Sequence, residues 1–134
     1  MTHKKLQKLC YYAQCWHFYF CNKERLADTD FQAWVHGPVS RKLYDTYRDY
    51  RYEEIPQYDG KIEIADESME VIKSVYRAYG HLDANQLESL SHSEKPWQNA
   101  RVGLTDYDPS YEVISEEDMY QYCVDDMNKS QPDV

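Results

Sequence analysis

The sequence predicts a mainly α-helical, compact single-domain fold around one buried central helix, with a minor β element as a small β-hairpin or short strands. Residues 6–20 (LQKLCYYAQCWHFYF) contain no Gly or Pro and are apolar nearly all round, which is typical of a buried helix. Several later stretches repeat apolar residues at helical spacing. The length of 134 residues suits one domain with one core.

The central helix is expected to begin after Thr2, a residue type that caps helix N-termini. Its lysines fall in the first turns, where we expect them to be exposed and available to acidic groups of the C-terminal region. A helical period places one stripe toward the core, with Trp16 at its edge. The stripe consists of Leu6, Leu9, Cys10, Ala13, His17 and Phe20.

The next predicted elements are a short extended segment and a second helix. Residues 31–35 alternate large and small side chains, as a strand does. His36-Gly37-Pro38 is expected to end the strand, and Pro38 fits a first helical position. A helix is therefore predicted from about Val39 to Arg51.

A β-hairpin is predicted within residues 54–64. Asp59-Gly60 is a strong hairpin turn signal, and isoleucines flank it. Pro56 cannot donate to a strand ladder, so the hairpin would lie at an edge or remain a loop.

The C-terminal half is predicted to hold further helices at residues 66–79, 84–91 and 116–128, and a helical turn that starts at Pro96. Residues 111–114 are expected to be extended, and residues 130–134 to be frayed.

Composition narrows the classes of function. The net charge is −9, and residues 105–134 carry nine acidic and one basic side chain. This charge disfavours direct nucleic-acid binding and favours a protein partner with a basic surface. The absence of an apolar run of about 20 residues and of a signal peptide predicts a cytoplasmic protein without membrane contact. The four cysteines are expected to be free thiols, and no cofactor or metal is expected.

Three passages carry a family resemblance: KLQKLCYYAQCW, AWVHGPV running on to Tyr44, and LESLSHSEKPWQNAR. Together they resemble the Panacea antitoxin domain family (SocA-like). This family is frequent in bacteria, prophages and phages and neutralises unrelated toxins by direct protein binding. The resemblance spans about residues 5–101. Its motif residues, expected to be structural, are Leu6, Leu9, Tyr12, Trp16, Trp34, Gly37, Pro38, His92, Pro96 and Trp97.

The chain departs from the family pattern in two places. Family members usually have a further helix before the first motif, and its absence would leave a face of the central helix open to a partner or a second copy, so a homodimer stays open. The acidic C-terminal segment matches no motif. We therefore expect a Panacea-like helical domain at residues 1–104 and a segment at 105–134 whose terminal helix packs on the same domain.

The resemblance implies a non-enzymatic antitoxin that binds a cognate protein toxin. One alternative is a proteolytic adaptor that delivers the toxin to an ATP-dependent protease, with the C-terminal end as the candidate docking segment. A second is a small enzyme that uses His36 or His92, although turn and helix-end roles fit both residues better. Candidate partner-binding residues are His36, Tyr44, Tyr47, Tyr50 and Tyr120, since tyrosines are enriched at protein contacts.

Other catalytic or metal sites are weaker interpretations. His17 is expected to be a core histidine with a hydrogen-bond partner. A nucleophilic pair of Cys10 or Cys15 with His36 would need an exposed, electropositive thiol, and both cysteines look buried. A zinc site from Cys15, His17 and Cys21 lacks a second pair of ligands.

Overall fold

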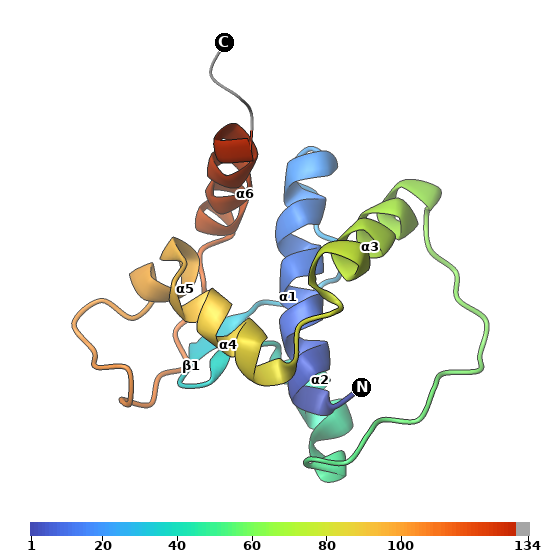
Figure 1. Ribbon diagram of the computed structural model, residues 1–134, viewed down its shortest axis with the longest axis horizontal. Helices are drawn as coiled ribbons and strands as arrows, with labels where there is room; N and C mark the ends of the chain where they lie inside the picture. The colour runs from blue at the N-terminus through green and yellow to red at the C-terminus, as the bar shows by residue number, and fades with distance from the viewer. Residues whose placement is uncertain (131–134) are drawn as a thin grey trace.

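The computed structural model describes residues 1–130, and the frayed end predicted for residues 130–134 lies almost wholly outside them. Its helices surround α1, which runs through the middle of the molecule (Figure 1). The predicted fold class, mainly helical with a small β element, is confirmed. The elements are α1 (His3–Phe20), β1 (Gln32–Trp34), β2 (Gly37–Val39), α2 (Arg41–Tyr47), the 3₁₀ turn η1 (Arg48–Tyr50), α3 (Asp66–Tyr79), α4 (Ala84–His92), α5 (Lys95–Asn99) and α6 (Glu116–Ser130).

The central helix α1 forms as expected, with the Thr2 side chain accepting a hydrogen bond from the backbone of Lys5 at 3.2 Å. It contacts α2, α3, α4, α6 and β2. Figure 1 places α2 near the first turns of α1 and α6 near its last turns. Most residues from 7 to 18 are buried. The other elements therefore pack around this one helix.

The most buried face of α1 is not the predicted stripe. Tyr11, Tyr12, Cys15 and Phe18 are at most 2% exposed, because α3, α6 and Phe31, just before β1, pack on that side. Phe20, assigned to the core stripe, is 57% exposed at the last helical position. The sequence period located the apolar residues correctly but could not tell which side the other elements would cover.

The lysines of α1 also differ from prediction. Lys8 is 1% exposed, and its Nζ donates to the carbonyl of Pro38 at 3.2 Å. Lys4 pairs with Glu88 of α4 at 2.8 Å, and Lys5 donates to the carbonyl of Gly80 at 2.7 Å. These side chains hold α4, the α3 end and the hairpin in place. They do not meet the acidic C-terminal helix, which instead pairs with residues 23 and 25.

The β element is an antiparallel hairpin of β1 and β2, with Ala33 paired to Pro38. The predicted strand at 31–35 is confirmed, but the prediction of a helix from Val39 is wrong by two residues. The chain turns back at Val35-His36, and Gly37, with a φ of 108°, opens β2, so Pro38 lies in the strand. Ser40 then caps α2, its side chain accepting from the backbone of Leu43.

The hairpin predicted at residues 54–64 is wrong. The described chain has no strand there, and Glu54 forms only an isolated bridge with Thr2. Pro56 cannot donate to a ladder, and nearly all of these residues are exposed, with no sheet beside them to pair with. Figure 1 shows this segment as a long connection that leaves the end of α2 and returns to α3.

Residues 111–114 are extended as predicted and lie beside β1. Ala33 donates to the carbonyl of Glu112 at 2.8 Å, and Ile114 donates to that of Phe31 at 2.7 Å. The helices predicted at 66–79, 84–91, 96 onward and 116–128 are α3, α4, α5 and α6. No helix in the described part of the chain is long and apolar enough to cross a membrane.

A polar network lies inside the core. Glu94, 8% exposed, accepts a hydrogen bond from the hydroxyl of Tyr12 at 2.7 Å. Tyr12 stacks on Tyr79 with ring centroids 4.3 Å apart, and the Tyr79 hydroxyl accepts from the Trp16 indole at 2.9 Å. Burial raises the pKa of Glu94 to about 7. These bonds fix the relative positions of α1, α3 and the start of α5.

Candidate protein-binding site

Four side chains gather on the surface beside the hairpin, and we call them the Arg41 cluster: Trp34, Arg41, Tyr44 and Tyr111. The rings of Trp34 and Tyr44 are 4.9 Å apart between centroids, and those of Trp34 and Tyr111 are 5.5 Å apart. The Arg41 guanidinium lies 5.4 to 5.9 Å from all three rings. The cluster therefore combines three aromatic rings with one cation in cation–π contact.

Local structure explains why these residues meet. In β1 the side chains alternate, so the fully buried Ala33 points inward and Trp34 points outward. Arg41 and Tyr44 are three residues apart on α2 and share a face. Tyr111 arrives on the extended segment beside β1. The cluster thus draws on three different segments of the chain.

Arg101 fixes the loop that delivers Tyr111. It is 4% exposed and donates to the carbonyls of Ala33 at 2.8 Å and Thr105 at 3.0 Å, and also to that of Asp108. Its guanidinium lies 4.8 Å from the Trp97 ring. This buried cation ties the 103–110 loop to the hairpin.

Two of the five predicted partner-binding residues lie at or beside the cluster. Tyr44 is a member of it, and the Arg48 guanidinium covers its ring at 5.4 Å. His36 sits in the hairpin turn with a 74% exposed side chain, 3.0 Å from the carboxylate of Glu88. His36, Trp34 and Tyr111 share the lining of a small hollow of about 170 Å³.

The other three lie elsewhere. Tyr47 and Tyr50 pair with each other at 6.3 Å, on the far part of α2 and η1. Tyr120 is on α6, where it contacts Tyr19 at 6.5 Å and the ammonium of Lys23 at 4.6 Å. Tyr19 is sixteen residues along α1 from the Tyr44 contact at His3, a separation of roughly 24 Å. The structure does not bring Tyr120 and Tyr44 together.

Sequence reasoning missed Arg41 and Tyr111 and assigned Trp34 to the core. The alternation of side chains along an extended segment would have indicated that Trp34 and Tyr111 point away from the core. With Phe31 and Ala33 buried on one face, Trp34 must lie on the other. Tyr111 and Val113 alternate with the buried Ile114 in the same way. The meeting of these side chains depends on long-range pairing, which no local pattern displays.

The remaining motif residues lie in or around the core. Pro96 and Trp97 are buried, and the Trp97 indole donates to the carbonyl of Trp34 at 2.9 Å. His92, the last residue of α4, stacks on Trp97 at 3.9 Å and hydrogen-bonds the backbone of Val35. Burial lowers the His92 pKa.

The candidate nucleophiles and metal ligands on α1 are two thiols and a hydrogen-bonded histidine. Burial raises the pKa of Cys10 to about 11 and that of the fully buried Cys15 well above its usual range, so both stay thiols at neutral pH. The expected role of His17 is confirmed. Its Nδ1 contacts the carbonyl of Glu24 at 2.7 Å and its Nε2 the Ser68 hydroxyl at 2.8 Å. Among residues 1–130 no group of side chains is arranged to hold a metal.

A second surface feature is an apolar groove of about 550 Å³ between α1, α2, α3 and residues 26–31. We call it the α1 groove. Its floor is the predicted core stripe of α1, from Leu6 to Ala13. Ile72, Val75 and Tyr76 of α3 form one wall, and Leu43 of α2 lies at its end. The groove and the Arg41 cluster flank α2 on different sides.

Residues 6–98 match the family described as "Antitoxin SocA-like, Panacea domain", which is more than half of the chain. The chain belongs to this family. No curated protein and no solved structure matches the chain. The matched span begins within α1 and ends within α5, and of the Arg41 cluster only Tyr111 lies outside it. The family indicates a role of the toxin–antitoxin type, with a protein partner and a binding function rather than catalysis.

Proposed function

We propose that the chain is an antitoxin that neutralises a protein toxin by binding it directly, with the Arg41 cluster at the centre of the interface. The observation that carries the proposal is the exposed packing of Arg41 against Trp34, Tyr44 and Tyr111. Family membership supports the toxin as partner.

The chemistry of the cluster suits protein recognition. Trp, Tyr and Arg are the residues that most often dominate binding energy in protein interfaces. The Arg41 side chain is already held between rings, so less side-chain freedom is lost when a partner arrives. His36 lies beside the cluster, in the lining of the same small hollow, as a candidate peripheral contact.

Charge favours a toxin with a basic surface. The chain carries 24 acidic and 15 basic residues. A complementary basic partner would associate faster at low salt than at high salt. Binding over the active site or the substrate surface of the toxin would then neutralise it without chemistry by the antitoxin.

The two alternatives are less well supported. An adaptor needs the same binding step plus a protease-docking segment, and the segment suggested for that role, residues 130–134, lies almost wholly outside the described chain. An enzyme would need a reactive group in a cleft. His36 is largely exposed at a turn, and His92 is stacked on Trp97 and hydrogen-bonded to the backbone.

Co-expression with the product of the neighbouring reading frame tests the proposal. We expect that product to inhibit growth alone, to co-purify with the tagged chain, and to lose both rescue and co-purification when Tyr44→Ala and Tyr111→Ala are combined. Each exposed interface aromatic removed should weaken binding by about 2 kcal/mol.

Tyr107→Ala is the matched control, since Tyr107 lies four residues from Tyr111 and is 88% exposed. It should leave binding unchanged. A harmless neighbour that does not bind the wild-type chain would remove the support for an antitoxin role with that partner. Full binding by the folded Tyr44/Tyr111 double variant would reject the Arg41 cluster as the interface.

A further inference from the structure

The geometry points to the α1 groove as the receptor for an amphipathic helix of the partner, apolar on one face and rich in Lys or Arg on the other. This inference rests on the proposed function and names the chemistry of the partner segment. A helix laid in an apolar groove is a recurring mode of peptide recognition.

The groove has the shape and surface that such a helix needs. Its floor on α1 is Leu6, Leu9, Cys10 and Ala13, which follow one another at helical spacing. The volume of about 550 Å³ lies inside the range of roughly 300 to 1,000 Å³ typical of binding pockets. Several apolar side chains from one face of a helix would fit into this volume, and they would be removed from water on binding.

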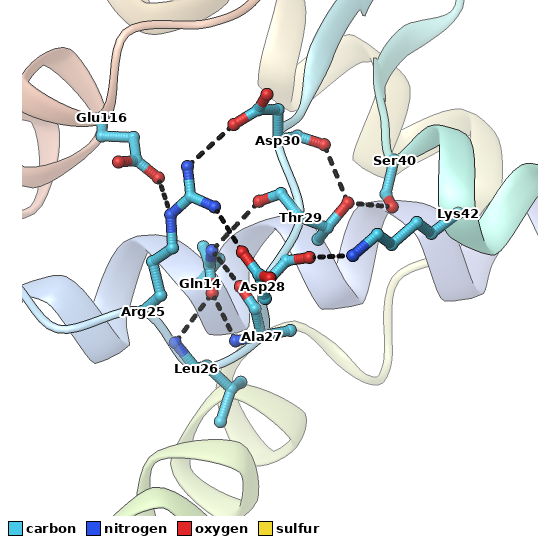
Figure 2. A network of polar contacts seen from close by, with 10 residues as sticks. All are labelled: Gln14, Arg25, Leu26, Ala27, Asp28, Thr29, Asp30, Ser40, Lys42 and Glu116. Atoms are coloured by element: carbon cyan, nitrogen blue, oxygen red, sulfur yellow. Dashed lines mark hydrogen bonds and ion pairs between the residues drawn. The ribbon is translucent and has the colours of Figure 1, made fainter.

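The wall formed by residues 26–29 is held rigid by hydrogen bonds (Figure 2). The buried amide of Gln14 accepts from the backbone of Leu26 at 2.9 Å and of Ala27 at 3.1 Å, and donates to the carbonyl of Ala27 at 3.0 Å. The hydroxyls of Thr29 and Ser40 are 2.7 Å apart. A groove built this firmly is preorganised for a ligand.

Ion pairs reinforce the same wall from outside. In Figure 2 the Arg25 guanidinium points at three carboxylates, 3.1 Å from Asp28, 2.8 Å from Asp30 and 2.8 Å from Glu116 of α6. The carboxylate of Asp28 is thus already paired, while its carbonyl accepts from Lys42. These contacts link the groove wall to α2 and α6.

Charge around the groove selects a basic helix. From Asp45 to Glu70 the chain carries nine acidic and three basic residues. The connection between η1 and α3 reaches the groove at Ile55, which donates to the carbonyl of Met1, a groove residue. It ends at Asp66, where α3 begins, and Ile72, Val75 and Tyr76 further along this helix line the groove. Asp28 and Lys42 are the charged side chains in the groove lining itself, so the acidic excess lies in the segment that adjoins the groove at Met1. This excess would repel fatty acids and other anionic amphiphiles and attract Lys and Arg on the outer face of a bound helix.

The test uses two labelled peptides of about 18 residues with the same leucine face, one with Lys and one with Glu on the other face. Fluorescence anisotropy should show that the Lys peptide binds and that its affinity falls as the salt concentration rises. The affinity of the Glu peptide should be lower by a factor of about ten or more. Ala13→Phe, which fills the groove, and Leu43→Ser, which makes one end polar, should each weaken the Lys peptide about tenfold.

Two sets of charge variants distinguish an effect of the acidic segment beside the groove from an effect of the net negative charge of the whole chain. Glu53→Gln, Asp59→Asn and Glu63→Gln together should weaken the Lys peptide by about fivefold. The matched triple variant Asp106→Asn, Glu112→Gln and Asp125→Asn removes as much charge elsewhere and should have less than about half that effect. Thermal unfolding confirms that each variant is folded.

Three results would overturn the inference: equal binding of both peptides, unchanged binding by the folded Ala13→Phe and Leu43→Ser variants, or a wild-type dimer that Ala13→Phe converts to a monomer. The last would make a second copy the occupant. Because the peptides replace the toxin, a negative result here leaves the proposed antitoxin function standing. Failure of the neighbouring gene product to bind leaves the peptide result intact.

Discussion

Lys8 places an amine inside the molecule, 1% exposed and with one hydrogen bond, to the carbonyl of Pro38. Burial, with a smaller effect from Lys4, lowers its pKa to about 7. In the unfolded chain the pKa is the ordinary value near 10.5. Between these values the unfolded chain binds a proton that the folded chain does not, so this residue's contribution to stability rises with pH from about 7 to about 10.

Lys8→Met tests this directly. Below pH 7 the folded wild type carries a buried ammonium that methionine removes, so the variant should be the more stable protein at pH 6. The advantage should shrink by a few kcal/mol, at about 1.4 kcal/mol per pKa unit, as the pH rises to 9.5. Urea unfolding at several pH values measures the difference. Lys73→Met, at an exposed site on α3, serves as control, and a constant gap for Lys8→Met would contradict the account.

For single residues, the sequence predicts what a side chain requires better than it predicts which elements will cover that side chain. His17 was predicted as a hydrogen-bonded core residue, since an imidazole on an apolar stripe needs partners. The burial of Lys8 was not predicted, because it depends on the hairpin and α4 covering the first turns of α1. The same holds for Trp34, whose exposure depends on which face of β1 meets α1.

The hairpin of β1 and β2 is the element that positions Trp34 of the Arg41 cluster, and Gly37 follows directly after its turn. Its φ of 108° is strained for other residues, and a Cβ there would lie 2.7 Å from the Lys8 side chain and 3.0 Å from that of Ser91. Lys8 is buried and cannot move aside easily. The glycine therefore allows both this backbone conformation and the close approach of the hairpin to α1 and α4.

Gly37→Ala should destabilise the protein by about 2 to 4 kcal/mol, from backbone strain plus overpacking. Gly103→Ala is the matched control. Its φ is also positive, at 86°, but no atom lies within 4 Å of the added Cβ, so it should cost only about 1 kcal/mol from strain. Denaturant midpoints compare the two variants. Equal losses would mean that the contact with Lys8 does not constrain the turn.

Most elements could be predicted because their signals are local: helical spacing, a capping serine before α6, proline at the start of α5. The wrong predictions lie where the structure depends on the pairing of one strand with another. Asp59-Gly60 is a good turn sequence, but no strands form around it in the described chain. The real hairpin turns at Val35-His36, and its second strand occupies the positions where a helix start was expected. Strand formation needs a partner strand and a covered face, and neither is visible in a short window.

The whole molecule presents two different surfaces on either side of α2, the Arg41 cluster and the α1 groove. The family and the central helix were predictable from three motifs in order. The cluster was only partly predictable, because its members come from β1, α2 and residue 111. The groove was not predicted as a groove, since its floor has the same periodic pattern as a core-facing stripe.

In the proposed function, binding of the chain to its toxin is sufficient for neutralisation. The direct test of this is a titration of the purified toxin's activity with the purified chain, without any protease. We expect inhibition to be complete near one chain per toxin molecule, with Tyr44→Ala/Tyr111→Ala requiring a large excess and Tyr107→Ala behaving as wild type. A toxin that stays active in a saturated complex would contradict direct neutralisation and would favour delivery to a protease instead.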